Sequence, residues 1–389
     1  MISRQHILEI LRGYDPENIT IGVLGGHSAL DVCHGAKKFG FRTVAVCQKG
    51  RELTYSKYYK SRPDMDVVPG QLAPWHSTKG IVDEVILLDK FADIVNEDVQ
   101  KQLRDMNTIF IHNRYFWVYC DFEQIENDFL VPIFGTREML KLEERDVANN
   151  QYYLLEQAGV RFPEIYSVPD EIDRLVLVKV NEDLRGYERA FFLASSPEDY
   201  LKKSQELIDA KVITKENLDK AVIEEFIVGA QVNFNFFYSP LDEELEFMGT
   251  DMRRQTNLDG LLRLPAPEQM KVLEYMKPRM IETGHVAVTI KESLVEKAFE
   301  IGEKFIQLTK RELPPGLIGP FALQGAVSAE EGREELVIFD VSLRIPGSPG
   351  TRFTPYSGYL YGDSLSYGER IAMEIQTAQK SGKLEDIVT

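Results

Sequence analysis

Gln324 and Asp340 are the residues whose types and spacing most directly suggest chemistry, because a β-hairpin would bring their side chains together. Apolar runs at 319–327 and 336–344 flank a polar turn, a pattern that predicts two antiparallel strands. In an antiparallel pair of strands, the residue numbers of opposed residues add up to the same value along the pair. A turn centred between the two runs therefore places Gln324 opposite Asp340. Arg344 then lies on the same face, since side chains alternate with a period of two. An amide oxygen, a carboxylate and a guanidinium together predict a magnesium–phosphate site, and the alternative is a solvated hairpin face.

A glycine-rich turn near the N-terminus suggests an anion site. Gly25 and Gly26 end an apolar run and precede His27 and Ser28, where a helix is expected to begin. Backbone N–H groups at a helix N-terminus bind anions, and glycine allows a ligand to approach the backbone closely. His27 could donate to a phosphate or to a substrate carbonyl. The alternative is a structural turn in which Ser28 caps the helix.

Two cationic residues are candidates for phosphate binding. Arg114 follows the expected strand 108–111, at the strand end where α/β sheets bind ligands, and its guanidinium could bind phosphate in a bidentate way. Lys179 interrupts the apolar strand 175–180, where a buried ammonium group needs an anionic partner. The alternatives are a solvated loop arginine and a lysine that protects a sheet edge.

Two further segments could contact a nucleotide. Glu224 and Glu225 lie near the end of the expected strand 221–228, where carbonyls could accept from an adenine amino group and carboxylates could bind ribose hydroxyls. A strand end with solvated acidic residues is the alternative. The loop 346–351, rich in glycine and proline, closely follows Arg344, and this position favours contact with substrate phosphate or ribose.

The order of apolar segments predicts a parallel α/β domain followed by an α+β body. We expect an N-terminal substrate-side domain at 1–129, a small subdomain at 130–220, and a large C-terminal subdomain with the metal site at 221–389. Residues 61–80 form a proline-containing insertion that suggests a surface excursion or an oligomer contact. The expected helices are 2–12, 28–39, 97–105, 141–159, 197–207 and 292–309, and the expected strands are 19–24, 41–47, 85–88, 108–111, 175–180, 189–193, 221–228 and 232–237.

The composition is that of a globular enzyme and argues against several other classes. The chain has 389 residues, of which 43% are hydrophobic and 28% charged, and its net charge is −17. This acidic balance argues against a general nucleic-acid binder. The three cysteines are too scattered for a disulfide framework or a zinc cluster, no apolar run is long enough to span a membrane, and the first residues have no signal-peptide pattern. We therefore expect a cytoplasmic protein without nucleic-acid or membrane partners.

The motifs together resemble those of the ATP-grasp ligases, and most closely the archaeal formate-dependent 5-formaminoimidazole-4-carboxamide ribonucleotide synthetases. The resemblance runs nearly from end to end and rests on the segments 26–28, 35–37, 126–135, 223–225, 237–240, 257–260, 314–324 and 366–372. It implies an ATP-grasp fold and the ATP-dependent joining of formate, through formyl phosphate, to the amine of an aminoimidazole-carboxamide ribonucleotide in purine biosynthesis. It also implies Mg²⁺ or Mn²⁺ as the metal and a homo-oligomeric assembly.

Position by position, the resemblance implies roles for individual residues. On the substrate side these are His27, Ser28, Arg114, Asn257, Arg344 and Thr351. Those for ATP are Arg145, Lys179, Glu224, Glu225 and Ile227, and those for the metal are Gln324 and Asp340. The physical logic agrees, since Mg²⁺ prefers oxygen ligands and neutralises charge on a transferred phosphoryl group.

Several positions depart from the pattern of this family. The loop 181–189 has a single glycine where the family usually has a glycine-rich phosphate loop, and Asp340 stands where glutamate is usual. Arg114 stands where a serine is usual, and the loop after Arg344 lacks the usual paired glycines and asparagine. Two other interpretations therefore stay open: a diverged ligase for another carboxylate–amine pair, and a nucleotide-binding paralogue without turnover.

Overall fold

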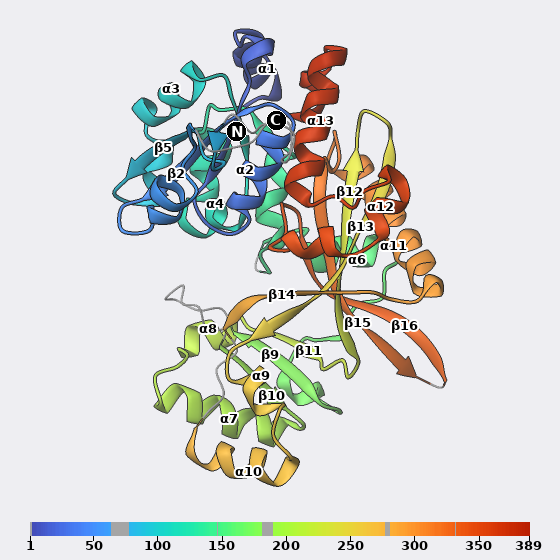
Figure 1. Cartoon of the computed structure of the whole chain (residues 1–389). Coiled ribbons are helices and arrows are strands. Elements are labelled where there is room, and N and C mark those ends of the chain that lie inside the picture. Colours follow the sequence, from blue (N-terminus) through green and yellow to red (C-terminus); the bar gives the residue numbers. More distant parts are fainter. Residues whose placement is uncertain (1, 64–77, 146, 181–189, 277–280, 331) are drawn as a thin grey trace.

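Three β-sheets organise the chain, which a computed structural model describes at residues 2–63, 78–145, 147–180, 190–276, 281–330 and 332–389. A parallel sheet lies in the upper part of Figure 1, a small antiparallel sheet lies in the lower part, and a long antiparallel sheet extends between them. Both chain termini lie in the upper part (Figure 1). The predicted phosphate loop 181–189 and most of the insertion 61–80 lie outside the described residues.

The first sheet is parallel throughout, as the sequence predicts for the N-terminal domain. Its strands lie in the order β5-β2-β1-β6-β7. Every residue of the central strand β1 is buried, which explains its continuous apolar sequence. The bounds of these elements are β1 Thr20–Leu24, β2 Arg42–Gln48, β5 Glu84–Leu88, β6 Thr108–Ile111, β7 Ile133–Phe134, α1 Arg4–Arg12, α2 Ala29–Lys38, α3 Glu97–Asp105, α4 Arg114–Tyr119 and α5 Phe122–Asn127. In the insertion, the two-residue strands β3 (Arg62–Pro63) and β4 (Thr78–Lys79) pair with each other.

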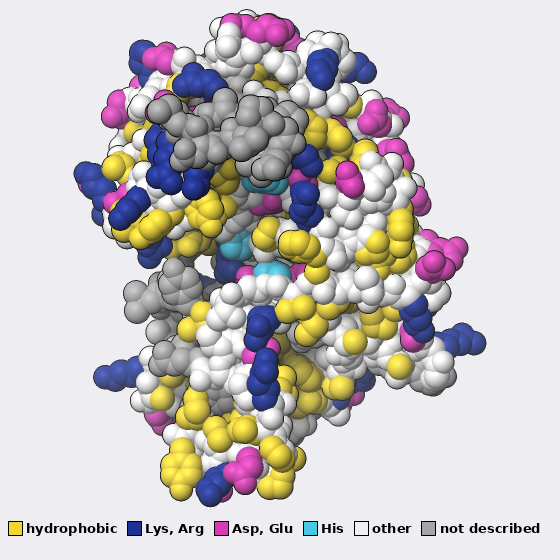
Figure 2. Space-filling view, viewed as in Figure 1, with side chains coloured by type: hydrophobic (Ala, Val, Ile, Leu, Met, Phe, Trp, Pro, Cys, Tyr) yellow, Lys and Arg dark blue, Asp and Glu magenta, His cyan; other side chains and the backbone are white. Residues whose placement is uncertain are grey.

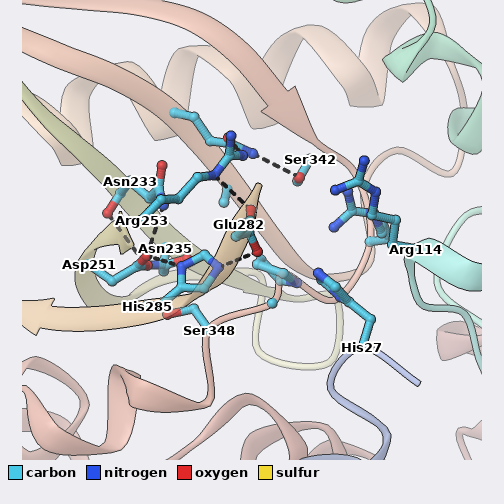
Figure 3. A pocket seen from close by; sticks show the side chains of 15 residues that line it. His27, Arg114, Asn233, Asn235, Asp251, Arg253, Glu282, His285, Ser342 and Ser348 are labelled. Atoms are coloured by element: carbon cyan, nitrogen blue, oxygen red, sulfur yellow. Dashed lines mark hydrogen bonds and ion pairs between the residues drawn. The ribbon is translucent and has the colours of Figure 1, made fainter. Parts of the chain in front are cut away.

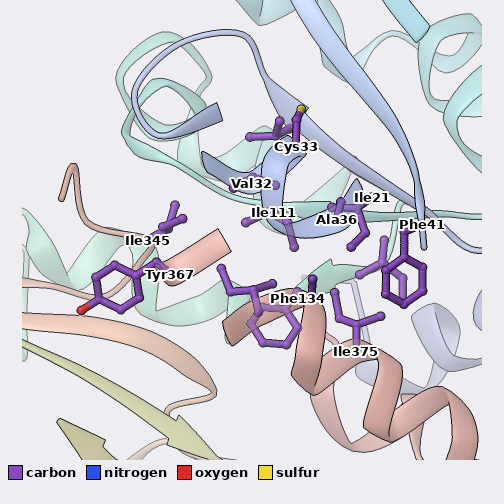
Figure 4. Close-up of a cluster of buried hydrophobic side chains, with 14 of the residues drawn as sticks. Ile21, Val32, Cys33, Ala36, Phe41, Ile111, Phe134, Ile345, Tyr367 and Ile375 are labelled. Carbon is purple, nitrogen blue, oxygen red and sulfur yellow. The ribbon is translucent and has the colours of Figure 1, made fainter. Parts of the chain in front are cut away.

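Helix α13 (Tyr367–Ser381) packs on α2 and joins the end of the chain to the first sheet (Figure 1). Gly35 of α2 and Gly368 of α13 meet backbone to backbone, so a methyl group at either position would overlap the partner helix. Apolar side chains from both ends of the sequence form one core here, among them Ile21 and Ile375 (Figure 4). The glycine-rich turn that precedes α2 is therefore held in place by both ends of the chain.

The second sheet is antiparallel, with the strand order β10-β9-β11-β8. Lys179 lies on β9, which pairs with β10 on one side and β11 on the other, so the interpretation of Lys179 as an edge lysine is wrong. Strand β11 ends at Glu225, three residues before the end of the expected strand 221–228. The bounds are β8 Ile165–Tyr166, β9 Val176–Val180, β10 Ala190–Ala194, β11 Val222–Glu225, α7 Pro197–Asp209 and α8 Lys215–Asp219.

The third sheet has the strand order β14-β13-β12-β15-β16 and two faces of different character. Along β12, Asn233 and Asn235 face a polar cavity, whereas Phe234 and Phe236 belong to an apolar core. Helices α6 and α11 supply the other side of that core. The bounds are β12 Ala230–Ser239, β13 Glu244–Gln255, β14 Glu282–Val288, β15 Gly319–Glu330, β16 Arg333–Ser342, α6 Gln151–Gln157, α9 Leu258–Leu261, α10 Ala266–Tyr275, α11 Glu292–Glu312 and α12 Tyr356–Tyr361.

The helix expected over 141–159 is interrupted in the structure. A 3-10 turn ends at Glu143, and the short helix α6 begins only at Gln151. Asn149 has a left-handed backbone conformation, with φ of 56°, and the Asn150 side chain accepts from the N–H groups that begin α6. The backbone of Asn149 and the cap at Asn150 therefore start a new helix within the range 141–159, for which the apolar periodicity had predicted one continuous helix.

The remaining expectations about the chain as a whole concern cysteines and membranes. Cys33, Cys47 and Cys120 are all buried and free, as their scatter in the sequence predicts. Among the helices that the structure describes, none combines the length and the apolar character that crossing a membrane requires.

Candidate functional site

The hairpin formed by β15 and β16 pairs Gln324 with Asp340, which confirms the predicted juxtaposition. The pairing depends on a β-bulge. Near the turn Glu330 pairs with Arg333, and the residue numbers of this pair add up to one less than those of Gln324 and Asp340. The register shifts directly after Gln324 along β15, and without this shift Gln324 would pair with Phe339. The bulge therefore brings the amide and the carboxylate together.

A row of polar side chains crosses the third sheet at the level of this pair. Gln324 also pairs with Asn233 of β12, and Asn233 in turn pairs with Asp251 of β13. The adjacent strands β13, β12, β15 and β16 therefore contribute one polar residue each, which are Asp251, Asn233, Gln324 and Asp340. Asp251 is completely buried and Gln324 nearly so, and buried polar groups of this kind need partners.

Three side chains hold the carboxylate of Asp251. The amide nitrogens of Asn233 and Asn235 donate to it at 2.8 and 2.6 Å, and His285 Nδ1 contacts it as well. The other ring nitrogen of His285, Nε2, lies 2.9 Å from Glu282 Oε1. Burial opposes charge on the ring, but hydrogen bonds to these two carboxylates raise the pKa of His285 to about 9. The imidazole is therefore protonated, and both of its N–H groups donate to carboxylates.

Arg253 connects this network to the Gln324–Asp340 pair. Its Nε lies 3.4 Å from Glu282 Oε2. Its Nη2 donates to Gln324 Oε1 and lies 4.0 Å from Asp340 Oδ2. From the other side, Arg145 Nη2 lies 3.5 Å from Asp340 Oδ1. Two guanidinium groups therefore surround the predicted metal ligands.

The side-chain oxygens of Gln324 and Asp340 suit a hard cation that also coordinates phosphate oxygens. It offers one amide oxygen and one carboxylate, and Mg²⁺ in such sites takes its remaining ligands from water and phosphate. The guanidinium groups beside the pair match the charge of a phosphate. Within the described ranges, no group of three or more His, Cys, Asp or Glu side chains could form a metal cage.

The side chains of the polar row and of its network, other than Asp340 and Arg145, line one cavity together with residues of the N-terminal domain (Figure 3). His27 comes from the turn before α2, Arg114 from the first turn of α4, and Arg344 from the segment after β16. Histidine and charged side chains are visible in a hollow between the upper and lower parts of the molecule (Figure 2). The cavity lining is made of His27, Arg114, Asn233, Asn235, Asp251, Arg253, Glu282, His285, Ala322, Gln324, Ser342, Arg344, Pro346, Gly347 and Ser348.

His27 occupies its position because the neighbouring loop contains a glycine. A Cβ atom on Gly347 would lie 2.5 Å from the His27 ring, so a larger residue would displace the ring. Burial and the nearby charge of Arg344 lower the pKa of His27 to about 3, so the ring is neutral. Its Nδ1 has no hydrogen-bond partner among the described residues. Ser28 does not cap α2, contrary to one interpretation of the sequence, because its hydroxyl donates instead to the carbonyl oxygen of Pro346 at 2.8 Å.

Arg114 and Arg344 approach the same indole ring. Their guanidinium carbons lie 6.0 and 5.9 Å from the ring centroid of Trp117. Arg344 Nη2 also lies 3.4 Å from Glu143 Oε2, and burial raises the pKa of Glu143 to about 7. Two guanidinium groups on one side of the cavity suit a phosphate or carboxylate ligand.

Lys179 has its anionic partner within the chain. Its Nζ lies 2.5 Å from Glu224 Oε1, and the Tyr152 hydroxyl donates to Glu224 Oε2 at 2.8 Å. Burial lowers the pKa of Lys179, and the charge of Glu224 acts against this. Glu225 pairs instead with Arg161 Nη2 at 2.9 Å. Both glutamates are buried, so the interpretation of a solvated strand end is wrong.

Nine of the thirteen predicted site residues do not line the cavity, namely Ser28, Arg145, Lys179, Glu224, Glu225, Ile227, Asn257, Asp340 and Thr351. Asn257 is exposed at the start of α9, and Ile227 is half-buried just after β11. Thr351 is fully buried in the 3-10 turn that follows the cavity loop. The sequence analysis did not single out eight of the lining residues, and the alternation of polar and apolar residues along β12 was the one signal for any of them. These residues are Asn233, Asn235, Asp251, Arg253, Glu282, His285, Ala322 and Ser342.

Solved structures with low sequence identity identify the fold. N5-carboxyaminoimidazole synthetase from Staphylococcus aureus complexed with ADP is similar with a TM-score of 0.52 and 14% identity, over 92% of this chain and 77% of that one. N5-carboxyaminoimidazole ribonucleotide synthetase from Thermotoga maritima has a TM-score of 0.53 and 14% identity, over 92% and 75% of the two chains. The chain therefore has an ATP-grasp fold, as the sequence resemblance implies.

One solved structure and two family profiles are more specific than these neighbours. An IMP biosynthesis protein, PurP, from Thermococcus kodakaraensis is similar with a TM-score of 0.65 and 27% identity, over 95% of this chain and all of that one. Family profiles described as a protein of unknown function (DUF1246) and a domain of unknown function (DUF1297) match residues 21–166 and 199–389.

Curated relatives cover the whole chain. Those from Methanothermobacter thermautotrophicus and Methanocaldococcus jannaschii are each 38% identical over 100% of this chain and over 99% and 100% of their own lengths. Both are named 5-formaminoimidazole-4-carboxamide-1-(β)-D-ribofuranosyl 5′-monophosphate synthetase. The chain belongs to this family of synthetases.

Proposed function

We propose that this chain joins formate to the 5-amino group of 5-aminoimidazole-4-carboxamide ribonucleotide and cleaves ATP to ADP and phosphate. ATP first phosphorylates formate to formyl phosphate, and the amine then attacks the formyl carbon and releases phosphate. The observation that carries this proposal is the cavity in which the His27 turn, two guanidinium groups and Gln324 converge, with Asp340 paired to Gln324 beside it. The names of the full-length relatives support the choice of substrates.

On the substrate side, we assign His27 to the imidazole ribonucleotide, because its neutral ring faces the cavity with an unpartnered nitrogen. Arg114 and Arg344 bind the ribonucleotide phosphate, since guanidinium groups recognise phosphate oxygens in a bidentate way. Ser28 maintains the turn through its bond to the cavity loop. Direct contacts of Asn257 and Thr351 with substrate stay predictions.

On the ATP side, Lys179 and Arg145 supply positive charge next to Asp340, and the backbone around Glu225 and Ile227 accepts from the adenine amino group. Lys179 Nζ also donates to the carbonyl oxygen of Phe339, the residue beside Asp340, at 3.3 Å. The Glu224 carboxylate maintains the position of Lys179 instead of binding ribose.

At the metal site, Gln324 and Asp340 would hold Mg²⁺ or Mn²⁺, and Arg253, which donates to Gln324 here, would be free to donate to a phosphate oxygen. The metal would supply positive charge that neutralises the transferred phosphoryl group. The chain's own contribution is to hold two oxygen donors and three cations, Arg145, Lys179 and Arg253, around the place of transfer.

We also propose that the three parts at 1–129, 130–220 and 221–389 act as substrate-side domain, small ATP-grasp subdomain and large ATP-grasp subdomain. Strand β7 extends the first sheet to Phe134, and α13 returns to pack on α2, so contacts cross both boundaries. A homo-oligomeric assembly is part of the proposal.

The test is ADP release by the purified protein with ATP and Mg²⁺, with and without the ribonucleotide and formate. Turnover that requires both co-substrates supports the proposal. ADP release only with another acid–amine pair would instead support a diverged ligase, and nucleotide binding without turnover would support a paralogue that has lost activity. Detection of the formylated ribonucleotide by mass spectrometry identifies the product.

A further inference from the structure

The network of Asp251, His285 and Glu282 extends from a buried carboxylate to the cavity that His27 also lines. Its side chains become more exposed in order: Asp251 is 0% exposed, His285 9% and Glu282 27%. The oxygens of Asp251 are occupied by two asparagine amides and one ring nitrogen. Asp251 is therefore an anchor for the imidazole, and the end of the network that a ligand can reach is Glu282.

His285 cannot accept a proton in this arrangement, because both ring nitrogens face carboxylates. Its role is to orient Glu282 and to keep it ionised. Burial opposes the charge of Glu282, but the contacts with His285 and Arg253 lower the pKa of its carboxyl group to about 2. A carboxylate with fixed orientation, a charge at neutral pH and partial exposure to the cavity is an acceptor for a ligand N–H group.

Glu282 also lies one guanidinium group away from the proposed phosphate end of the site. Arg253 contacts Glu282 through Nε and the Gln324–Asp340 pair through Nη2. His27 lines the same cavity, and the charge of Glu282 partly offsets the lowering of the His27 pKa by burial. Glu282 therefore lines the same cavity as His27 (Figure 3) and is joined through Arg253 to the Gln324–Asp340 pair.

We propose that Glu282 accepts a hydrogen bond and then the proton from the attacking amino group, and that His285 and Asp251 are positioning residues for this carboxylate. The inference rests on the proposed function. The nitrogen lone pair forms the new C–N bond with the formyl carbon, and the C–O bond to phosphate breaks with its electron pair on the phosphate. The proton leaves nitrogen for Glu282 and passes to the departing phosphate, which is released as hydrogen phosphate. An arylamine conjugated with a carboxamide is a weak nucleophile, so removal of its proton is the step that needs help.

The experiment separates acyl-phosphate formation from amine transfer in a Glu282→Gln variant. The full-length protein is given ATP, Mg²⁺, formate and the ribonucleotide together with hydroxylamine, which attacks acyl phosphates without a base. Formyl hydroxamate and formylated ribonucleotide are then measured in the same sample. We expect the ratio of ribonucleotide product to hydroxamate to fall by about 100-fold in the variant, the usual size of a general-base effect. Formate-dependent hydroxamate formation stays near the wild-type rate, which also demonstrates that the variant is folded.

Two further variants test the positioning role. His285→Gln is expected to lower the product-to-hydroxamate ratio by about tenfold, as loss of an orienting residue does. A merely structural role would slow both reactions equally and leave the ratio unchanged. Glu303→Gln, on the exposed side of α11, is the matched control and leaves the ratio at the wild-type value.

The outcomes also distinguish this inference from the proposed function. If Glu282→Gln transfers the amine at the wild-type rate, or loses hydroxamate formation together with transfer, the role of Glu282 as amine acceptor is wrong and the ligase function stands. If the wild-type protein forms neither hydroxamate nor formylated ribonucleotide, the proposed function fails, and this inference fails with it.

Discussion

The interaction of His285 with two carboxylates predicts a pH-dependent stability that a single substitution removes. Burial opposes protonation of the ring, but Asp251 and Glu282 raise the pKa of His285 from 6.5 to about 9. At about 1.4 kcal/mol for each tenfold change in proton affinity, this rise corresponds to about 3 kcal/mol of folding free energy. The lowered pKa of Glu282 reflects the same contacts, so its contribution is not added.

The sign of the effect follows from which state holds the proton more tightly. The folded protein binds the His285 proton more tightly than the unfolded chain does, so the contribution is fully present below pH 6.5 and is lost as the pH rises through about 9. We therefore expect His285→Gln to lower the free energy of unfolding by about 3 kcal/mol near pH 6 and by less than about 1 kcal/mol near pH 10.

Urea unfolding of the wild-type and variant proteins across this pH range measures the gap between their free energies of unfolding. His6→Gln supplies the control, because His6 is exposed on α1, and we expect no gap at either pH. A His285→Gln gap that stays constant or widens as the pH rises would falsify the assignment of a protonated imidazole between two carboxylates.

Three further predictions concern the site. Asp340→Asn removes one of two proposed metal ligands and should lower formate-dependent ADP release by about 100-fold while the melting temperature stays near that of the wild type; near-normal activity would contradict the metal assignment. Lys179→Met leaves the Glu224 carboxylate buried without its cation, so the free energy of unfolding in urea should fall by about 3–5 kcal/mol. Adding Glu224→Gln to the same chain should restore part of this free energy, and an unchanged stability of Lys179→Met alone would argue against the buried pair. Gly347→Ala forces the His27 ring to move and should lower kcat/KM for the ribonucleotide by about 100-fold with little change in stability, whereas normal kinetics would exclude His27 from the substrate site.

The N-terminal sheet and the Gln324–Asp340 pair were predictable because their signals are local. The buried strand β1 is a continuous apolar run that ends in a glycine turn, and this order is typical of a parallel unit. The hairpin and its turn position bring Gln324 to within one residue of Asp340, and the bulge completes the pairing. The bulge could not be predicted, because no residue pattern in the two strands indicates it.

The network of Asp251, Glu282 and His285 could not be predicted, because its members meet only through the order of strands in the third sheet. Asp251 and His285 lie on adjacent strands, but α9, α10 and other residues separate β13 from β14 in the sequence. No spacing rule connects them. The sequence predicted the strand 232–237 without indicating that Asn233 and Asn235 on it line a cavity.

By itself, the sequence determined the residue types that could do chemistry, most of the helices and strands, and the resemblance to a family of synthetases. Only the tertiary structure decided which charges are partners. Lys179, predicted to need an anion, has Glu224 beside it, and Gln324, predicted as a metal ligand, accepts from Arg253. The physical reason is that burial and Coulomb interactions depend on distances between groups far apart in the sequence, and these distances exist only once the sheets have formed.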